Sequence, residues 1–273
     1  MPLSGRDPQI GKTRQVVVPC ARSLPEASTS RARPVTLRVM RVVVADGAMA
    51  ISPSSRVDNF SMTASAFAGA PGGAIPDFSS SGKTWVLTGG PAYKKIPGYA
   101  GPGPILDKPG AEYKFGRQNA VADTSNPILK PWAKKLMDIA NDRVNAGGVP
   151  FVDDSRCWLG GVPSVLLFPG EAVVFLQTPK EVWILSKRDA QVRRVYLNVP
   201  HSKNPGYSWT GESVGHYENG DTLVVDTIGL DDQGPLDRFR TPHTKQLHVV
   251  ERYRLVNGGK GIEITLTVED PGA

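Results

Sequence analysis

The chain has 273 residues, a mean hydropathy of −0.24 and a formal net charge of +6, which is enough for one large domain or two small ones with a buried core. The basic character is confined to the start, because residues 1–41 hold eight of the 32 Lys and Arg residues but only two of the 26 acidic residues. The remaining chain is neutral and lacks the basic surface that phosphate binding requires, so nucleic acid is excluded as an expected partner.

Residues 1–73 are rich in Ser, Ala, Arg and Pro, and their apolar runs, such as Val39–Val44, are short. Such a composition predicts a disordered leader, a targeting segment or an extension outside the mature protein. The apolar core of a secretory signal peptide is missing from this segment. Whether residues 1–72 belong to the mature protein stays open.

Residues 74–273 are predicted to form a single β-rich domain with a loop-rich entry. Gly and Pro recur up to residue 126, and only Thr84–Leu87 is typical of a strand there. A helix is then predicted over about 127–146, with Asn126 as its cap and Gly147-Gly148 at its end. An apolar stripe at helical spacing is expected to pack on the domain, formed by Leu129, Trp132, Leu136, Ile139, Ala140 and Val144.

From about residue 162 to 269 the sequence alternates as strands do, with short turns and no helix between them. Predicted strands are Ser164–Phe168, Ala172–Thr178, Glu181–Lys187, Gln191–Val199, Glu212–Glu218, Asp221–Ile228, Gln246–Val256 and Gly261–Glu269. We therefore expect a mainly β fold, an antiparallel up-and-down meander that forms a barrel or a strongly curved sheet. A two-sheet sandwich is the alternative.

The clearest hairpin signal is Asn219-Gly220 between two alternating strands. A two-residue loop pairs Glu218 with Asp221 and places Ser213 opposite Asp226 on one face, with His216 on the other. A carboxylate between valine and isoleucine needs a hydrogen-bonding or cationic partner if it is buried. Asp226 is thus a candidate catalytic residue, although a purely structural role satisfied by a neighbour remains an alternative.

All four histidines follow residue 200. His243 and His248 are five residues apart, which is a poor spacing for one metal ion. His201 and His243 are predicted to lie in loops at the ends of strands, at the mouth of the barrel. Trp209 and Arg240 would complete a polar rim around this mouth. A sheet histidine held by hydrogen bonds is the alternative reading for His248.

Consecutive arginines Arg193 and Arg194 must point to opposite faces of a strand, so one is available to a carboxylate such as Asp226. A serine hydrolase is disfavoured, because the chain lacks G-x-S-x-G and the hairpin separates Ser213 from His216. The candidate catalytic residues are Asp226, His243 and His201. The candidate ligand-binding residues are Arg194, Trp209, Ser213, His216, Arg240 and His248.

Cys20 and Cys157 are too few for a disulfide framework, and Cys157 fits a small buried residue better than a reactive thiol. No C-x-x-C or H-E-x-x-H motif occurs, so neither a metal nor another cofactor is predicted. No apolar run reaches the length of a membrane span. Oligomeric state is left open.

Eight segments of the chain form a specific pattern: PDFSSSGKTW (76–85), NPILKPWAKK (126–135), SRCWLGGVP (155–163), FLQTPKEVWIL (175–185), RRVYLNVPH (193–201), SWTGESVGHYENGDTLVVDTIGL (208–230), RTPHTKQLHVVERYRL (240–255) and VEDPGA (268–273). In these segments the chain resembles a family of uncharacterised, usually exported proteins of soil bacteria. The resemblance implies a periplasmic or secreted location but no established activity. It also implies a chain that continues past Asp270–Ala273.

Three functions are compatible with these features. The first is a barrel whose mouth or interior binds a small, mostly apolar molecule, and it predicts a sizeable cavity. The second is an enzyme that uses Asp226 with a rim histidine for acid/base chemistry, and it predicts both groups facing one cavity. The third is a structural protein of the cell envelope, and it predicts a filled interior with an exposed edge strand or apolar patch.

Overall fold

The computed structural model describes residues 36–46, 75–80, 84–94, 120–149, 157–167 and 171–273, all within one compact unit, Arg33–Ala273. The strands in this described part are β1 (Thr36–Asp46), β2 (Trp85–Lys94), β3 (Ala172–Gln177), β4 (Glu181–Ser186), β5 (Val192–Leu197), β6 (Glu212–Glu218), β7 (Thr222–Ile228), β8 (His248–Val256) and β9 (Gly261–Glu269). The helices are α1 (Pro131–Asn145) and the 3-10 turns η3 (Ser164–Leu167) and η4 (Asn257–Gly259).

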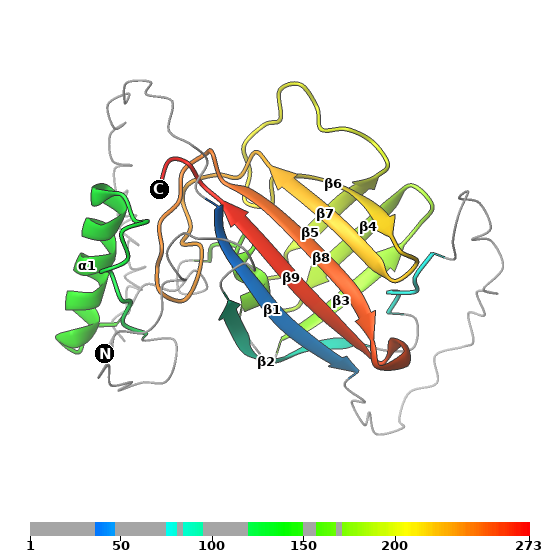
Figure 1. The fold of residues 1–273 in the computed structure, drawn as a ribbon, viewed down its shortest axis with the longest axis horizontal. Coiled ribbons are helices and arrows are strands. Elements are labelled where there is room, and N and C mark those ends of the chain that lie inside the picture. Colours follow the sequence, from blue (N-terminus) through cyan, green and yellow to red (C-terminus); the bar gives the residue numbers. More distant parts are fainter. Residues whose placement is uncertain (1–35, 47–74, 81–83, 95–119, 150–156, 168–170) are drawn as a thin grey trace, which may run out of the picture. The chain divides into compact units, whose positions relative to one another are not determined.

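The strands form one strongly curved sheet in which each strand pairs with the next (Figure 1). β9 also pairs with β1 along its length, which closes the sheet into a barrel. The shortest strand pairing is between β2 and β3, where only Trp85 with Val173 and Val86 with Ala172 are in register. The predicted mainly β, barrel-like fold is thereby confirmed.

The predicted meander is wrong at one junction, because β5 and β6 run parallel. Val195, Tyr196 and Leu197 pair with Ser213, Val214 and Gly215. Parallel neighbours need a long crossover, and residues 198–211 supply it. This crossover carries His201 and Trp209, so the departure from simple hairpins is also what brings two predicted site residues to the barrel.

Two local predictions are also corrected. β1 lies within the segment expected to be a leader, where its valine-rich run Val42–Val44 suits a strand once neighbouring strands are present to pair with it. Residues 164–167 form the turn η3 instead of a strand, and all four are buried, whereas a strand with one solvated face would alternate. Residues 1–35 and Phe168 lie outside the described residues.

Helix α1 is confirmed, but it presents a different face from the one predicted. Leu136 is 49% exposed and Met137 is fully buried. Its other buried side chains are Ala133, Asn141 and Val144. Asn141 is buried because its amide donates to the carbonyl of Ala122 and accepts from the Ala122 amide, both at 2.9 Å. The polar Asn141 anchor, which hydrophobic periodicity ignores, sets the rotation of the helix.

The predicted cap of α1 is also wrong. The helix begins at Pro131, and the Asn126 side chain instead accepts a hydrogen bond from the amide of Ile128 in the preceding turn. Proline suits this first position, since the first amide of a helix has no partner within it. The predicted end at Gly147-Gly148 is confirmed by hydrogen bonds from both glycine amides back to the last turn.

The barrel interior is packed with apolar side chains from the alternate strand positions that point inward. Its main cluster is Phe78, Trp85, Leu87, Val165, Leu166, Leu167, Val173, Phe175, Val182, Ile184, Val195, Leu197, Leu223, Val225, Tyr253, Ile262, Ile264 and Leu266. Close packing of this kind stabilises the fold through burial of apolar area. The described interior is therefore a core and does not supply the large cavity expected for an internal ligand.

Candidate functional site

The β6–β7 hairpin determines which predicted site residues face the interior. Glu218 pairs with Thr222, so the loop contains three residues, Asn219, Gly220 and Asp221, and not two. The extra residue shifts the register by one position relative to the prediction. Asp226 therefore lies opposite Val214, while Ser213 lies opposite Thr227.

This shift separates Asp226 from Ser213, which were predicted to lie side by side. Ser213 and Thr227 are buried inside the barrel, whereas the side chain of Asp226 is 39% exposed on the outer face. His216 is on the face opposite Ser213, as predicted, and hydrogen-bonds Glu218 at 2.9 Å. The two-residue loop was a reasonable inference from Asn-Gly, but a glycine at positive φ also suits a three-residue loop.

Asp226 belongs to a row of alternating acids and histidines on the outer face, which we call the outer-face cluster. Nε2 of His201 lies 2.9 Å from Oδ1 of Asp226, and Nε2 of His248 lies 3.0 Å from the same oxygen. Nδ1 of His201 lies 3.0 Å from Oε1 of Glu212, and Nδ1 of His248 lies 3.6 Å from Oε2 of Glu269. Each imidazole thus has a carboxylate at both ring nitrogens.

Four strands and one loop supply this cluster, with Glu212 at the start of β6. His248 and Glu269 are register partners on β8 and β9, so their side chains share a face. Asp226 on β7 is diagonal to His248, because its register partner is Val250. The crossover between β5 and β6 brings His201 over Asp226, and a 2.8 Å hydrogen bond from the Ser202 amide to Glu212 fixes its course.

The electrostatics of the outer-face cluster favour ionised acids. Partial burial raises the pKa of Asp226, but the hydrogen bonds from His248 and His201 outweigh it and leave that pKa below its usual value. The hydrogen bond to Asp226 raises the pKa of His248 above its ordinary value despite partial burial. Hydrogen bonding by Ser202 lowers the pKa of Glu212. The cluster holds three carboxylates against two imidazoles.

A second polar group lies inside the barrel, on the other face of the same sheet. Arg193 forms a buried ion pair with Glu251 and donates a 2.9 Å hydrogen bond to Oγ of Ser213. Thr227 also accepts from Arg193, and the hydroxyl of Tyr253 donates to Glu251 at 3.1 Å. Burial and the negative charge of Glu251 raise the pKa of Tyr253 well above its usual value. Surrounded by core side chains, this network has a structural role.

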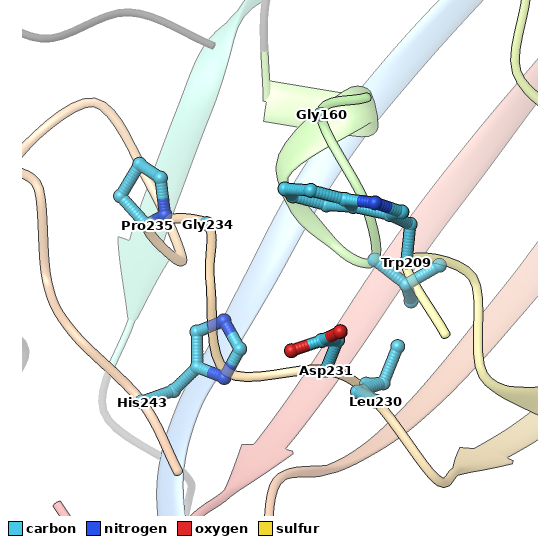
Figure 2. A pocket seen from close by; sticks show the side chains of 9 residues that line it. Gly160, Trp209, Leu230, Asp231, Gly234, Pro235 and His243 are labelled. Atoms are coloured by element: carbon cyan, nitrogen blue, oxygen red, sulfur yellow. The ribbon is translucent and has the colours of Figure 1, made fainter. Parts of the chain in front are cut away.

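A small pocket lies where β6 begins, β7 ends and β8 begins, and we call it the barrel-end pocket. Its cavity volume is about 10 Å³, roughly the space needed by one water molecule. Figure 2 shows the carboxylate of Asp231 beside the ring of His243, with the indole of Trp209 above them in this view. The lining residues are Gly160, Gly161, Val162, Trp209, Leu230, Asp231, Gly234, Pro235 and His243.

Local contacts hold the walls of the barrel-end pocket. Trp158 packs against Trp209 with ring centroids 5.3 Å apart. Gly161 has a φ of 70°, and a Cβ there would lie 3.1 Å from the carbonyl oxygen of Trp209, so glycine permits this close approach. Its amide donates to the side chain of Gln191 at 3.0 Å. Burial lowers the pKa of His243, so its imidazole is neutral near pH 7.

Two other candidate residues, Arg194 and Arg240, have structural partners. Arg194 is exposed, pairs with Glu181 and stacks on Tyr196, so it does not face either site. Arg240 is buried and donates to the carbonyl of Ala120, which ties the loop before β8 to the segment before α1. The structure thus places Trp209 and His243 together, and Asp226 with His201 and His248, but it does not join these groups into one rim.

Several participants were missed at the sequence level, although each had a signal. Glu251 is in phase with Val249 and Tyr253 on β8, and a carboxylate in the inward phase of a strand predicts a buried partner. Gly161 belongs to the pair Gly160-Gly161 and Asp231 to the run Asp231–Pro235, both typical of loops, where binding residues concentrate. Cys157 was expected to be buried but is exposed.

No protein-family model and no curated protein matches this chain. Among the described residues, no helix is long and apolar enough to cross a membrane. The assignment of function therefore depends on the geometry of the two sites.

Proposed function

We propose that the protein binds a small, mostly apolar molecule at the barrel-end pocket. The observation that carries the proposal is that Trp209 and His243, two residues from distant segments, face one hollow together with Asp231 (Figure 2). An apolar wall with a few convergent polar groups is the usual composition of small-molecule sites. The barrel supplies a rigid frame and the loops at its end supply the contacts.

The lining chemistry limits the ligand. Trp209, Leu230 and Pro235 offer apolar surface, and the indole suits stacking on a flat ring. Asp231 accepts hydrogen bonds, and a neutral His243 can donate or accept one. We therefore propose a ligand with a planar apolar part and at least one hydrogen-bond donor.

The present volume decides how such a ligand is held. A space of about 10 Å³ holds one small group, so the ligand inserts a single group and lies with the rest over Trp209, or displaces the loop at Gly234-Pro235. Both modes leave the packed barrel interior unchanged. The proposal differs in this respect from a barrel that encloses its ligand.

Native mass spectrometry of the full chain purified from its own host tests the proposal. A reproducible additional mass that is lost on denaturation is expected, and Trp209→Ala or His243→Ala should abolish it. His216→Ala is the matched control, because His216 is exposed on β6 and does not line the pocket. An unliganded mass, together with unchanged tryptophan fluorescence across a panel of planar small molecules, contradicts the proposal.

A further inference from the structure

We propose that the outer-face cluster is a pH-sensitive switch, which holds the crossover on the barrel while His201 and His248 are protonated and releases it when they are neutral. The crossover comprises residues 198–211, between β5 and β6. His201 lies on the crossover, whereas the other members of the cluster lie on strands of the barrel. The inference does not depend on ligand binding at the barrel-end pocket, since no residue of the cluster lines it.

The crossover has few buried anchors. From Asn198 to Ser208, every residue is exposed except His201 and Pro205. Backbone hydrogen bonds to the barrel hold the two ends of this stretch, through the amides of Asn198 and Ser208, with lengths of 2.8 and 3.0 Å. A segment that buries so little opens at low cost in free energy. The contacts of His201 therefore decide whether the middle of the crossover stays on the barrel.

The number of available protons decides whether these contacts attract. His201 faces Glu212 on β6 and Asp226 on β7, at 3.0 and 2.9 Å. His248 on β8 faces the same Asp226 and Glu269 on β9, at 3.0 and 3.6 Å. A protonated imidazole donates from both nitrogens, so all four contacts are then attractive. A neutral imidazole carries one N–H and one lone pair, so each ring then turns a lone pair toward a carboxylate and two of the four contacts repel.

The crossover is held most strongly in a defined range of pH. The hydrogen bond to Asp226 raises the pKa of His248 despite partial burial. The contribution of His248 is therefore complete below its unfolded pKa of about 6.5 and is lost as the pH rises through its folded pKa. Partial burial of Asp226 is outweighed by hydrogen bonds from His248 and His201, which lower its pKa. The contribution of Asp226 is complete above its unfolded pKa of about 3.9 and is lost as the pH falls through its folded pKa.

Release of the crossover also affects the barrel-end pocket. Trp209 lies near the end of the crossover, where it packs against Trp158 and lines the pocket. A crossover released at His201 holds this indole less firmly, so a ligand stacked on the indole should bind more weakly at high pH. This consequence rests on the proposed function, whereas the switch itself does not.

Hydrogen exchange of the full chain without ligand tests the switch. Exchange is measured by mass spectrometry at pH 5.5 and 8.5 and corrected for the intrinsic rate at each pH. Amides of the crossover, among them that of Ser202, which donates to Glu212, should be about tenfold less protected at pH 8.5, the change that corresponds to one pKa unit. Amides of β8 and β9 should keep their protection. Equal protection of the crossover at both pH values, or loss of protection in β8 and β9 together with it, contradicts the switch.

Substitution of the two histidines assigns the effect. His201→Gln and His248→Gln should each leave the crossover weakly protected at both pH values, with circular dichroism and thermal unfolding used to confirm a folded chain. His216→Gln is the matched control, because His216 pairs with Glu218 on the same outer face but outside the cluster, and it should retain the full difference. A full difference in folded His201→Gln and His248→Gln would overturn the switch.

The same chains separate the switch from the proposed function. Native mass spectrometry at pH 5.5 and 8.5 records the bound ligand beside the exchange data. A normal exchange difference in a chain that carries no ligand at either pH supports the switch and contradicts ligand binding at the barrel-end pocket. Bound ligand without any exchange difference in the crossover contradicts the switch alone.

Discussion

Arg193 and Glu251 form an ion pair inside the barrel, with side chains 3% and 0% exposed. They join β5 to β8 across the interior, and Ser213, Thr227 and Tyr253 complete their hydrogen bonds. Charges at this depth are tolerated only when paired, because removing them from water costs several kcal/mol per ion.

Removing one partner of this pair should be far more harmful than removing both. Glu251→Leu leaves the guanidinium of Arg193 buried without its counter-charge and should lower the free energy of unfolding by about 3–5 kcal/mol. The double variant Arg193→Met/Glu251→Leu should recover most of that loss. Urea unfolding of the single and double variants measures both values.

An outer-face pair provides the control for this experiment. Arg194 is adjacent to Arg193 in the sequence but lies on the exposed side, where it pairs with Glu181. Arg194→Met should cost no more than about 1 kcal/mol. Equal losses for Arg194→Met and Glu251→Leu would contradict the structural role given to the interior pair.

The rotation of α1 yields a second prediction. Met137→Ala should lower the free energy of unfolding by about 2–5 kcal/mol, because it opens a cavity beside Phe239 in a closed cluster. Leu136→Ala should change it by about 0.5 kcal/mol or less, as surface positions do. The predicted apolar stripe requires the opposite ranking, so thermal and urea unfolding of the two variants distinguish the two orientations directly.

A third prediction concerns the parallel junction of β5 and β6. A Cβ at Gly215 would lie 2.6 Å from the carbonyl oxygen of Val224 and 2.9 Å from a methyl group of Val195. Gly215→Ala should therefore destabilise the barrel by about 1–3 kcal/mol, the usual cost of overpacking. Gly206→Ala is the control, since nothing lies within 4 Å of its Cβ position. A Gly215→Ala chain as stable as the control would contradict the close approach at this junction.

Sequence periodicity predicted most strands well, because the pattern that marks a strand lies within the strand itself. β6 and β9 have the predicted bounds, because alternating side chains and a short turn fix both the period and the ends of a strand. The pairing partner is not a local property. Nothing in residues 198–211 states whether the chain returns antiparallel or crosses over, so the parallel β5–β6 pairing could not be predicted.

In the candidate sites, too, the residue types could be chosen from the sequence, whereas their partners could not. His201, Asp226 and His248 were chosen for their residue types. The predicted pairing of Asp226 with Ser213 is wrong, because one additional loop residue shifts the register and places the two side chains on opposite faces. One of Arg193 and Arg194 was expected to be available to a carboxylate such as Asp226, and Arg193 instead pairs with Glu251 inside the barrel. Its partner, Glu251, is 58 positions away in the sequence, and such a pairing emerges only from the closed sheet.

The buried state of His243 yields a prediction on pH. Burial lowers its pKa in the folded chain below the unfolded value of about 6.5. Below that pH the unfolded chain binds a proton that the folded chain does not, so stability is complete above about pH 6.5 and is lost as the pH falls toward the folded pKa. The slope from one such proton cannot exceed about 1.4 kcal/mol per pH unit.

His243→Gln isolates this contribution, because the raised pKa of His248 acts with the opposite sign and stays in both chains. Urea unfolding at pH 5, 6, 7 and 8 should show a smaller loss of stability at low pH for His243→Gln than for the unsubstituted chain. His216→Gln should retain the full loss, since His216 is exposed on β6. Parallel pH profiles for His243→Gln and the unsubstituted chain would mean that His243 takes up its proton as readily in the folded barrel as in water, and that the barrel-end pocket does not shield it.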